Sequence, residues 1–211
     1  NYTFIGKCTG SNTIEFKNNL AKLGTITNEE TSSWDGYLKA HRSRRLFFKE
    51  MGDMASDHGH PSARTENLSK KDAEKLFKLI LTGEFNSEDA DKFRGQMLTE
   101  MAKMSCEDGL VMQIHPGSRR NHSNQIFSKF GLDKGFDIPG STDYVSALKP
   151  LLDEVGLRTD LTIILFTLDE TTYSRELAPM AGVYPALKLG PPWWFFDSYE
   201  GIKRFRETTT E

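Results

Sequence analysis

The sequence predicts an α/β fold built around a parallel sheet. Short apolar runs of strand length alternate with longer segments whose apolar residues recur at helical spacing. Turn signals typical of two-residue hairpins are missing between these runs. Polar or aromatic residues follow each apolar run directly. Parallel strands joined by helical crossovers account for all three observations.

The N-terminal half is expected to be mostly helical. Residues 13–23 have helical spacing and stop at Gly24, and residues 28–49 repeat the pattern after an acidic first turn. Ser69 is expected to cap a helix that ends at Gly83. The other elements expected in this half are a weak strand at 51–55, a helix from Asn86 or Ser87 to about Cys106, and a turn at 107–109.

The C-terminal half contains the clearest strands. Leu161–Leu168 is rich in β-branched and aromatic residues, and Leu110–Ile114 is a shorter apolar run. The remaining elements are expected to be helices at 142–156, at 170–180 and from about Ser198, with a short strand at 186–189. These make about four strands in a single domain over residues 1–211. A closed parallel barrel needs eight strands, so the chain would hold about half of one.

Composition and charge exclude several classes of protein. Of the 211 residues, 37% are hydrophobic and 27% charged, which is typical of a soluble globular domain. The net charge of −3 provides no positive field for nucleic acid. No apolar run approaches the roughly 18 residues of a membrane helix. Cys8 and Cys106 are too few for a disulfide framework, so we expect reduced thiols and a cytoplasmic location.

Titratable residues at two strand ends are the first candidates for chemistry. His115 directly follows a buried run, where an imidazole can ligate a metal or transfer protons near neutral pH. A hydrogen bond to a neighbouring loop carbonyl is the alternative role for this ring. Asp57 and His58 follow the weak strand in the same way, although Asp57 could equally cap the next segment. The spacing of His58 and His60 is by itself a weak metal signal.

Binding residues are expected in the loops that follow the strands. Arg120 could pair with a carboxylate or phosphate, and Asn121 could bond sugar hydroxyls. A solvated surface pair is the alternative reading of Arg119 and Arg120. Trp193 and Trp194 begin a very apolar loop, where aromatic faces could line a carbohydrate site or pack in the core. Motifs for dinucleotides, nucleotide phosphates and serine hydrolases are missing from the sequence.

Taken together, four motifs resemble those of the uronate isomerase family, which belongs to the amidohydrolase superfamily. They occur in the family's order, with an α-helical insertion between the first two motifs as in the family. The helical segments 13–50 and 68–106 are expected to lie outside the barrel strands. The motifs are Ser56-Asp57-His58, His115-x-Gly117-x-x-Arg120-Asn121, Gly131-Leu132-Asp133-x-Gly135-Phe136-Asp137 and Leu189-Gly190-x-x-Trp193-Trp194-Phe195-x-Asp197.

The resemblance implies a fold, a reaction and a set of roles. The fold would be part of a distorted (β/α)₈ barrel, and the reaction the interconversion of aldo- and keto-hexuronates, such as D-glucuronate and D-fructuronate or D-galacturonate and D-tagaturonate. It implies a divalent metal, Zn²⁺, and a homo-oligomer. The residue roles implied are catalysis by His115 and His58, metal ligation by His115, and substrate binding by Arg120, Asn121, Trp193 and Trp194.

The sequence also departs from the family pattern. The family's first-strand His-x-His pair and last-strand aspartate, which bind the metal, have no counterpart here. We therefore expect the chain to correspond to the second half of the barrel, with the catalytic base outside it. Two alternatives stay open. One is a metal-dependent hydrolase of the same superfamily, and the other is a truncated remnant without turnover.

Overall fold

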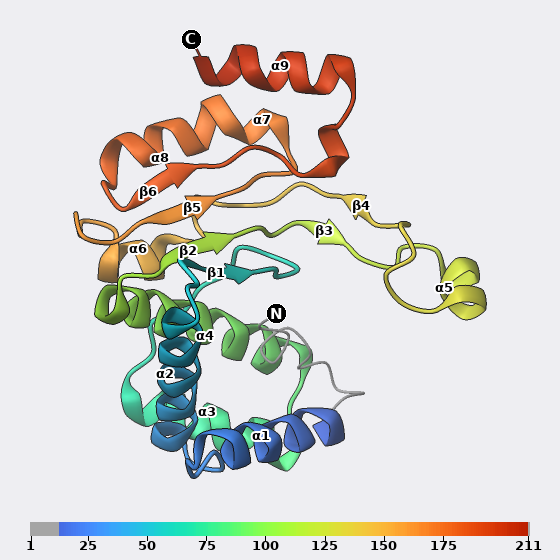
Figure 1. The fold of residues 1–211 in the computed structure, drawn as a ribbon. Helices are drawn as coiled ribbons and strands as arrows, with labels where there is room; N and C mark the ends of the chain where they lie inside the picture. The colour runs from blue at the N-terminus through green and yellow to red at the C-terminus, as the bar shows by residue number, and fades with distance from the viewer. Residues whose placement is uncertain (1–12, 211) are drawn as a thin grey trace.

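A computed structural model describes residues 13–210 and confirms the α/β fold (Figure 1). Four strands form a parallel sheet in the order β1-β2-β5-β6, so each strand lies beside the next sheet strand along the chain. A separate antiparallel ribbon of two short strands leaves this sheet. The strands are β1 (Ala55–His58), β2 (Val111–Ile114), β3 (Ser118–Arg119), β4 (Ile138–Pro139), β5 (Ile163–Leu165) and β6 (Leu187–Leu189).

Some of the helices flank the sheet, and the others form a helical layer below it in Figure 1. None of the described helices is long and apolar enough to cross a membrane. Cys8 lies outside the described residues. The helices are α1 (Thr13–Thr27), α2 (Trp34–Glu50), α3 (Lys70–Thr82), α4 (Ser87–Asp108), α5 (Asn124–Phe130), α6 (Lys149–Val155), α7 (Glu170–Thr172), the π-helical turn η1 (Tyr173–Leu177), α8 (Ala178–Val183), the 3-10 turn η2 (Trp194–Phe196) and α9 (Tyr199–Thr210).

The helix caps agree best with the expectation, whereas the strand expected at Leu161–Leu168 spans only Ile163–Leu165. Ser69 accepts a hydrogen bond from the Asp72 amide, and Gly83 ends α3 in the left-handed conformation, with φ of 85°. Asn86, rather than Ser87, caps α4 in a reciprocal capping box. Both features could be predicted from the sequence because each capping residue lies within a few residues of the helix end that it caps.

Several expected boundaries were wrong. The first strand is Ala55–His58 rather than 51–55, so His58 ends the strand instead of following it. Helix α2 begins at Trp34, capped by Ser33, because residues 28–33 form a turn. Helix α6 begins at Lys149 rather than at 142, with Pro150 in its first turn, where a proline is tolerated. The β3–β4 ribbon was not expected.

The two faces of the parallel sheet differ in burial. Ser56, Met112, Ile163 and Leu187 are all buried and lie on one face, which we call the covered face. Their neighbours along each strand point the other way, because side chains alternate along a strand. On that open face, one row of paired residues runs across all four strands: Asp57, Gln113, Ile164 and Lys188, all partly or fully exposed.

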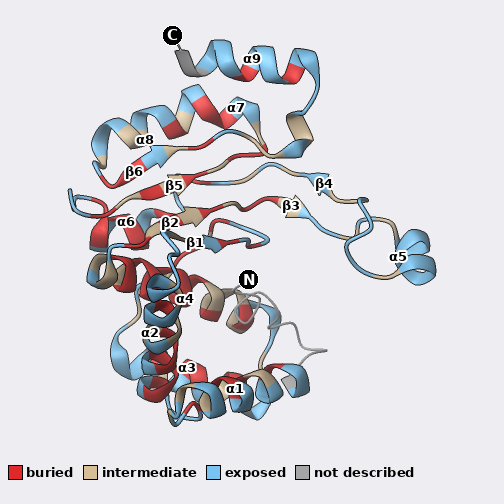
Figure 2. Ribbon diagram, viewed as in Figure 1, coloured by how far each residue is buried: buried red, intermediate tan, exposed pale blue. Residues whose placement is uncertain are grey.

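The helical layer has an aromatic core and a buried cation. Tyr37 stacks on Phe77 with ring centroids 5.1 Å apart. Arg45 is 1% exposed and donates to both carboxylate oxygens of Asp108, at 2.5 and 2.9 Å. His41, one helical turn before Arg45, is also buried, and neither ring nitrogen has a hydrogen-bond partner among the described residues. Figure 2 shows buried residues on α2, α3 and α4, which pack against one another.

Candidate active site

The ends of the parallel strands place the chemically active side chains. Parallel strands all finish at the same edge of a sheet, and the register pairs His58 with Ile114 and Leu165 with Leu189. The residues that directly follow the four strands are Gly59, His115, Phe166 and Gly190. They lie in one row across the sheet, where each strand ends and a loop begins. As expected from the sequence, His115 lies at the end of its strand.

His115 is held by a carboxylate from the neighbouring strand. Its Nε2 lies 2.9 Å from Oδ2 of Asp57, while the His115 amide donates to the His58 carbonyl at 3.0 Å. The His115 side chain is 9% exposed and that of Asp57 is 64% exposed. The contact follows from register, because Asp57 pairs with Gln113, two residues before His115 on the same open face.

Trp193 covers the His115 ring. The two ring centroids are 3.8 Å apart, and Trp194 stacks on Trp193 at 5.2 Å. Phe195 continues the stack, 5.0 Å from Trp194. Trp194 remains 58% exposed, so the aromatic series runs from the buried imidazole out to solvent. The structure therefore brings His115, Trp193 and Trp194 together.

Gly59 makes room for the same imidazole. A Cβ atom at this position would lie 2.5 Å from Cε1 of His115 and 3.2 Å from its Nδ1. Gly190, which directly follows β6, plays the equivalent part for Phe166, whose ring atoms would lie 2.6 Å from an added Cβ. Each of these two rings is thus accommodated by a glycine that directly follows the neighbouring edge strand.

Replacing Gly59 with alanine is expected to displace the His115 ring and break its contact with Asp57. A shift of about 1 Å in a reacting group can lower kcat/KM by about 100-fold, and forcing a methyl group into a packed site costs roughly 1–3 kcal/mol. Steady-state rates and thermal unfolding of the full-length protein would measure both effects. Gly182→Ala is the matched control, because no atom lies within 4 Å of its added Cβ. Equal behaviour of the two variants would contradict the packing argument.

His58 lies on the other side of the sheet from the Asp57–His115 pair. Its ring is 3% exposed and its Nε2 lies 3.0 Å from the Ser56 hydroxyl, on the covered face. Burial is the main cause that lowers the pKa of His58 well below its usual value, followed by the nearby His60. A catalytic role for His58 stays a prediction that this geometry does not favour. Asp57 is the residue of that strand end that contacts His115.

Arg120 and Asn121 brace a loop in this structure. Arg120 Nη1 lies 3.2 Å from Oδ2 of Asp137, and the other oxygen of that carboxylate accepts the Asn121 amide at 2.8 Å. The Asn121 side chain in turn accepts the Asp133 amide at 3.1 Å. Arg119 is exposed and makes no ion pair with any residue in the described part of the chain. Substrate binding by Arg120 and Asn121 stays a prediction.

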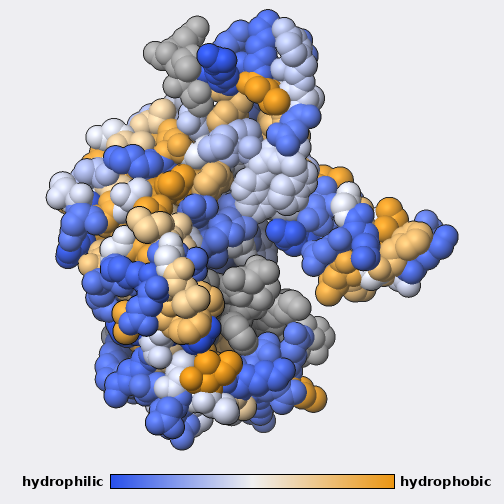
Figure 3. Space-filling view, in the orientation of Figure 1, coloured by the Kyte–Doolittle hydropathy of each residue, from blue (hydrophilic) through white to orange (hydrophobic). Residues whose placement is uncertain are grey.

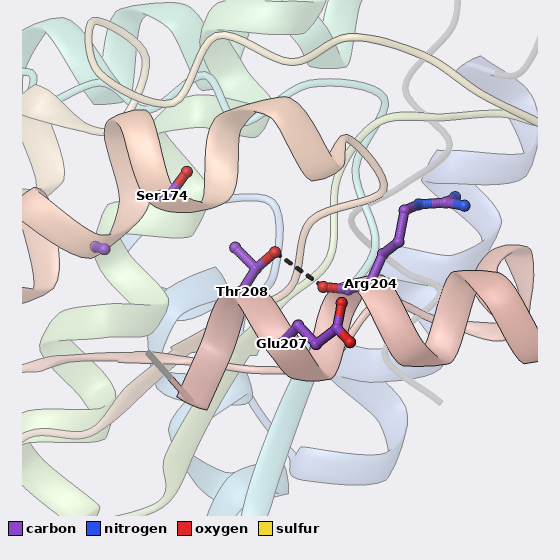
Figure 4. Close-up of a pocket in the computed structure, with 5 residues that line it drawn as sticks. Ser174, Arg204, Glu207 and Thr208 are labelled. Atoms are coloured by element: carbon purple, nitrogen blue, oxygen red, sulfur yellow. Dashed lines mark hydrogen bonds between the residues drawn. The ribbon is translucent and has the colours of Figure 1, made fainter.

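Two hollows lie on the C-terminal part of the molecule. One of about 640 Å³ separates Ser174 on η1 from Arg204, Glu207 and Thr208 on α9 (Figure 4). Another, of about 400 Å³, follows β6 and is lined by residues that include Gly190, Pro191 and Asp197. Neither is lined by His115 or Asp57. We place the candidate site at the Asp57–His115 pair, because catalytic side chains of parallel sheets gather at this edge.

The described residues do not form a complete metal centre. Among residues 13–210, no three His, Cys, Asp or Glu side chains lie close enough together to hold a metal ion. A catalytic zinc ion usually takes about three protein ligands. Nδ1 of His115 is buried without a hydrogen-bond partner among the described residues, so it is one available nitrogen donor. The described residues thus supply one candidate nitrogen ligand but no full ligand set, and metal ligation by His115 stays a prediction.

Gly59 and Asp137 were missing from the expected site residues, and the partner expected for Asp57 was wrong. Asp57 was recognised as a carboxylate beside an imidazole, but its partner is His115 rather than the adjacent His58. Gly59 carries no chemical signal in the sequence, since its role depends on the ring beside it. Asp137 belongs to the quoted Gly-Phe-Asp motif, and its contacts with Arg120 and Asn121 depend on the fold of the loop.

Comparisons with known proteins agree over nearly the whole chain. The glucuronate isomerase family model matches residues 7–211. Uronate isomerases of Rhizobium meliloti and Mesorhizobium japonicum are 65% and 66% identical over 196 residues, covering 93% of this chain and 42% of each relative. A crystal structure of glucuronate isomerase from Caulobacter crescentus has a TM-score of 0.88 at 56% identity, covering 92% of this chain and 41% of that one. The Thermotoga maritima uronate isomerase structure has a TM-score of 0.84 at 27% identity, covering 92% and 43%.

Proposed function

The chain belongs to the glucuronate isomerase family, and from that premise we propose that it is part of an enzyme that interconverts aldo- and keto-hexuronates. It spans about two fifths of the length of the curated relatives it matches, so the proposal concerns the full-length protein. The contact between Asp57 and His115 is the observation that carries it. D-Glucuronate and D-galacturonate are the proposed substrates, with D-fructuronate and D-tagaturonate as products.

We propose that the four parallel strands are part of a (β/α)₈ barrel of the amidohydrolase type. The sequential order β1-β2-β5-β6 supports this, because strands of such a barrel follow one another around the ring. The open face supports it too. Its row of Asp57, Gln113, Ile164 and Lys188 would face the barrel interior, while helices cover the opposite face.

The Asp57–His115 pair suits the proton transfers of this reaction. Isomerisation moves a proton between adjacent carbons and another between their oxygens, which requires an acid and a base in fixed positions. A carboxylate bonded to Nε2 fixes the orientation of the imidazole and stabilises its protonated form. Trp193 excludes water from the ring face. We assign His115 the proton-transferring role and Asp57 the positioning role.

A divalent metal such as Zn²⁺ is part of the proposal, as the family resemblance implies. A bound metal would supply Lewis-acid stabilisation of the substrate oxygens. The described residues alone do not fit a complete ligand set, so no step is assigned to it here. We also propose a cytoplasmic location, which the free thiol of Cys106 supports.

Activity measurements on the full-length protein test the proposal. We expect conversion of D-glucuronate or D-galacturonate to the corresponding keto acid and no turnover of simple esters, amides or lactones. Ester hydrolysis without uronate isomerisation would favour the hydrolase alternative. No turnover of any of these compounds by metal-loaded, folded protein would favour a non-catalytic role.

Arg120 is predicted to bind the uronate carboxylate. Losing a charge-assisted hydrogen bond costs roughly 1.5–3 kcal/mol, so Arg120→Met is expected to lower kcat/KM for D-glucuronate by about 10- to 150-fold. Arg158→Met is the control, because Arg158 pairs with Asp160 on the surface just before β5, at the opposite end of that strand from the site. An unchanged kcat/KM for Arg120→Met would move the role to the exposed Arg119, and Arg119→Met measured in parallel would detect this.

A further inference from the structure

Phe166 directly follows β5 and lies beside His115 in the row of strand ends. Its amide donates to the Ile114 carbonyl at 3.0 Å, which continues the pairing of β2 with β5 by one residue. Phe166 shares the open face with Ile164, because an added Cβ on Gly190 would contact both side chains. Its ring is partly exposed. The proton transfer itself does not require an apolar ring at this position, so the ring calls for a separate explanation.

The rings of His115 and Phe166 lean toward opposite edges of the sheet. His115 lies against Gly59, which follows β1, and an added Cβ there would be 2.5 Å from Cε1 of the imidazole. Phe166 lies against Gly190, which follows β6, and an added Cβ there would be 2.6 Å from both Cδ1 and Cε1 of the phenyl ring. A ligand that lies across the ends of β2 and β5 would therefore have a polar ring on one side and an apolar ring on the other.

Tyr144 holds the backbone of Phe166 in place. Its side chain is fully buried, and its hydroxyl donates to the Phe166 carbonyl at 3.1 Å. Burial is the main cause that raises the pKa of Tyr144 to about 12, so the hydroxyl stays protonated and remains a donor at neutral pH. With its amide, its carbonyl and its ring all in contact with fixed neighbours, Phe166 is preorganised for binding.

Phe166 is separate from the exposed apolar residues of the projecting segment, residues 118–139, which Figure 3 shows as partly hydrophobic. Ile126, Phe127 and Phe130 of that segment are between 37% and 55% exposed, whereas Phe166 is less exposed and lies in the row of strand ends. Ligand sites commonly combine apolar walls with a few polar groups, and in α/β folds they lie at this edge of the sheet. The position of Phe166 beside an imidazole fits such a wall.

The chemistry of a hexuronate suggests what the wall would contact. In the isomerisation the C2–H bond breaks and a C1–H bond forms, while a hydroxyl proton moves from O2 to O1. The carbons C3 to C5 take no part in these steps and only bind. An apolar wall accepts a C–H group, but it leaves a hydroxyl that faces it without a hydrogen-bond partner. Such a wall therefore distinguishes between epimers at the carbons that it contacts.

We infer that Phe166 is a specificity-determining residue of the site, with its ring packed against the C–H groups of the C3–C5 part of the substrate. The inference rests on the proposed isomerase function, in which His115 acts at C1 and C2. Neighbouring strands lie about 4.8 Å apart, so a six-carbon chain that begins at His115 reaches across the end of β5 to Phe166. Tyr144 is a positioning residue, because it acts through the Phe166 backbone.

Kinetics of the full-length protein with D-glucuronate and D-galacturonate, which differ only in configuration at C4, test the inference. Phe166→Ala is expected to raise KM more than it lowers kcat, and to change the ratio of the two kcat/KM values by about 10- to 200-fold, as for apolar contacts in a pocket. Phe166→Leu keeps an apolar wall and should retain most of the wild-type ratio. Tyr144→Phe should change the ratio in the same direction by a smaller factor.

Phe85→Ala is the matched control. Phe85 is also a partly buried phenylalanine, but it packs against the core of the helical layer between α3 and α4. A loss of stability alone would lower both kcat/KM values equally, so the control should leave their ratio unchanged. An unchanged ratio in Phe166→Ala, with a wild type that converts both uronates, would overturn the inference and leave the proposed function intact.

Binding of D-gluconate gives an answer that does not depend on turnover. This six-carbon acid has the polyol chain and the carboxylate but no aldehyde or ketone, so it cannot isomerise. Calorimetric titration is expected to give a Kd about 10-fold higher for Phe166→Ala than for the wild type or Phe85→Ala. Equal Kd values would overturn the inference. A raised Kd for Phe166→Ala in a protein that converts neither uronate would support the wall and reject the isomerase function alone.

Discussion

His115→Gln in the full-length protein is expected to lower kcat for D-glucuronate by about 100- to 10,000-fold, the usual contribution of a positioned acid or base. Asp57→Asn is expected to lower it less, by about 10- to 100-fold, because the amide keeps a hydrogen bond to the imidazole and loses only the charge. The reason in both cases is the 2.9 Å contact between His115 Nε2 and Asp57 Oδ2.

A double variant separates a shared role from two independent ones. If Asp57 acts through His115, the combined variant should be no slower than His115→Gln alone, since residues that act as a unit are strongly non-additive. Asp53→Asn, an exposed carboxylate just before β1, is the control. Full additivity of the two losses would show that Asp57 has a separate task.

Acid is expected to destabilise the folded protein steeply below pH 6.5. Burial, with Arg45 as the second cause, lowers the pKa of His41 to about 3. Burial, followed by Arg94 and His115, lowers the pKa of His60 to about 4. The pKa of His58 is lowered well below its usual value for the same first reason, burial. Three of the five histidines therefore stay neutral in the fold at pH values where the unfolded chain is protonated.

The sign of the effect follows from linkage. A lowered pKa means that the folded state binds fewer protons than the unfolded state, so stability is fully present above pH 6.5 and is lost as the pH falls toward the folded-state pKa. His41 and His60 then each contribute a loss of about 2 kcal/mol at pH 5, or about 4 kcal/mol together, and His58 adds to the loss in the same direction. That is a large part of the 5–15 kcal/mol that typically holds a domain folded.

Urea unfolding between pH 7.5 and 5 would measure this loss. His41→Leu places an apolar side chain of similar size in the aromatic core and removes one titrating group. The free energy of unfolding of this variant should therefore fall less steeply with decreasing pH than that of the wild type, by about 1.4 kcal/mol per pH unit. His122→Leu removes an exposed histidine and serves as the control. Equal slopes for His41→Leu and the wild type would show that His41 is not kept neutral by the fold.

The parts of the fold that the sequence predicted depend on local signals. Ser69 and Gly83 mark the ends of one helix within its own residues, and the β-branched residues Ile163 and Ile164 favour the strand that forms there, Ile163–Leu165. The strand Ala55–His58 was displaced because Met51 and Met54 looked more strand-like than the polar Ser56 and His58. Those polar residues are buried because each is the hydrogen-bond partner of the other, which only the folded strand shows.

The candidate site was predicted only in part for a related reason. His115 was recognisable because a titratable residue ends an apolar run. Its partner was not, because the pairing of Asp57 with Gln113 depends on the register of two strands more than fifty residues apart. The packing of Gly59 and Trp193 on the same ring depends on the end of β1 and on the loop that follows β6. The residue type identifies a reactive side chain in the sequence, whereas the residues that surround it depend on the topology of the fold.

The sequential order of the sheet has a consequence for biosynthesis. Each strand of the parallel sheet pairs with the strand of that sheet made before it, so no strand must wait for a later segment to be inserted between existing neighbours. Helices α3 and α4 are made between β1 and β2, so the helical core can collapse before β2 emerges and pairs with β1. Nascent chains should therefore gain protease resistance stepwise as β2, β5 and β6 emerge. At each stage, the growing edge of the sheet is the surface that chaperones would need to shield.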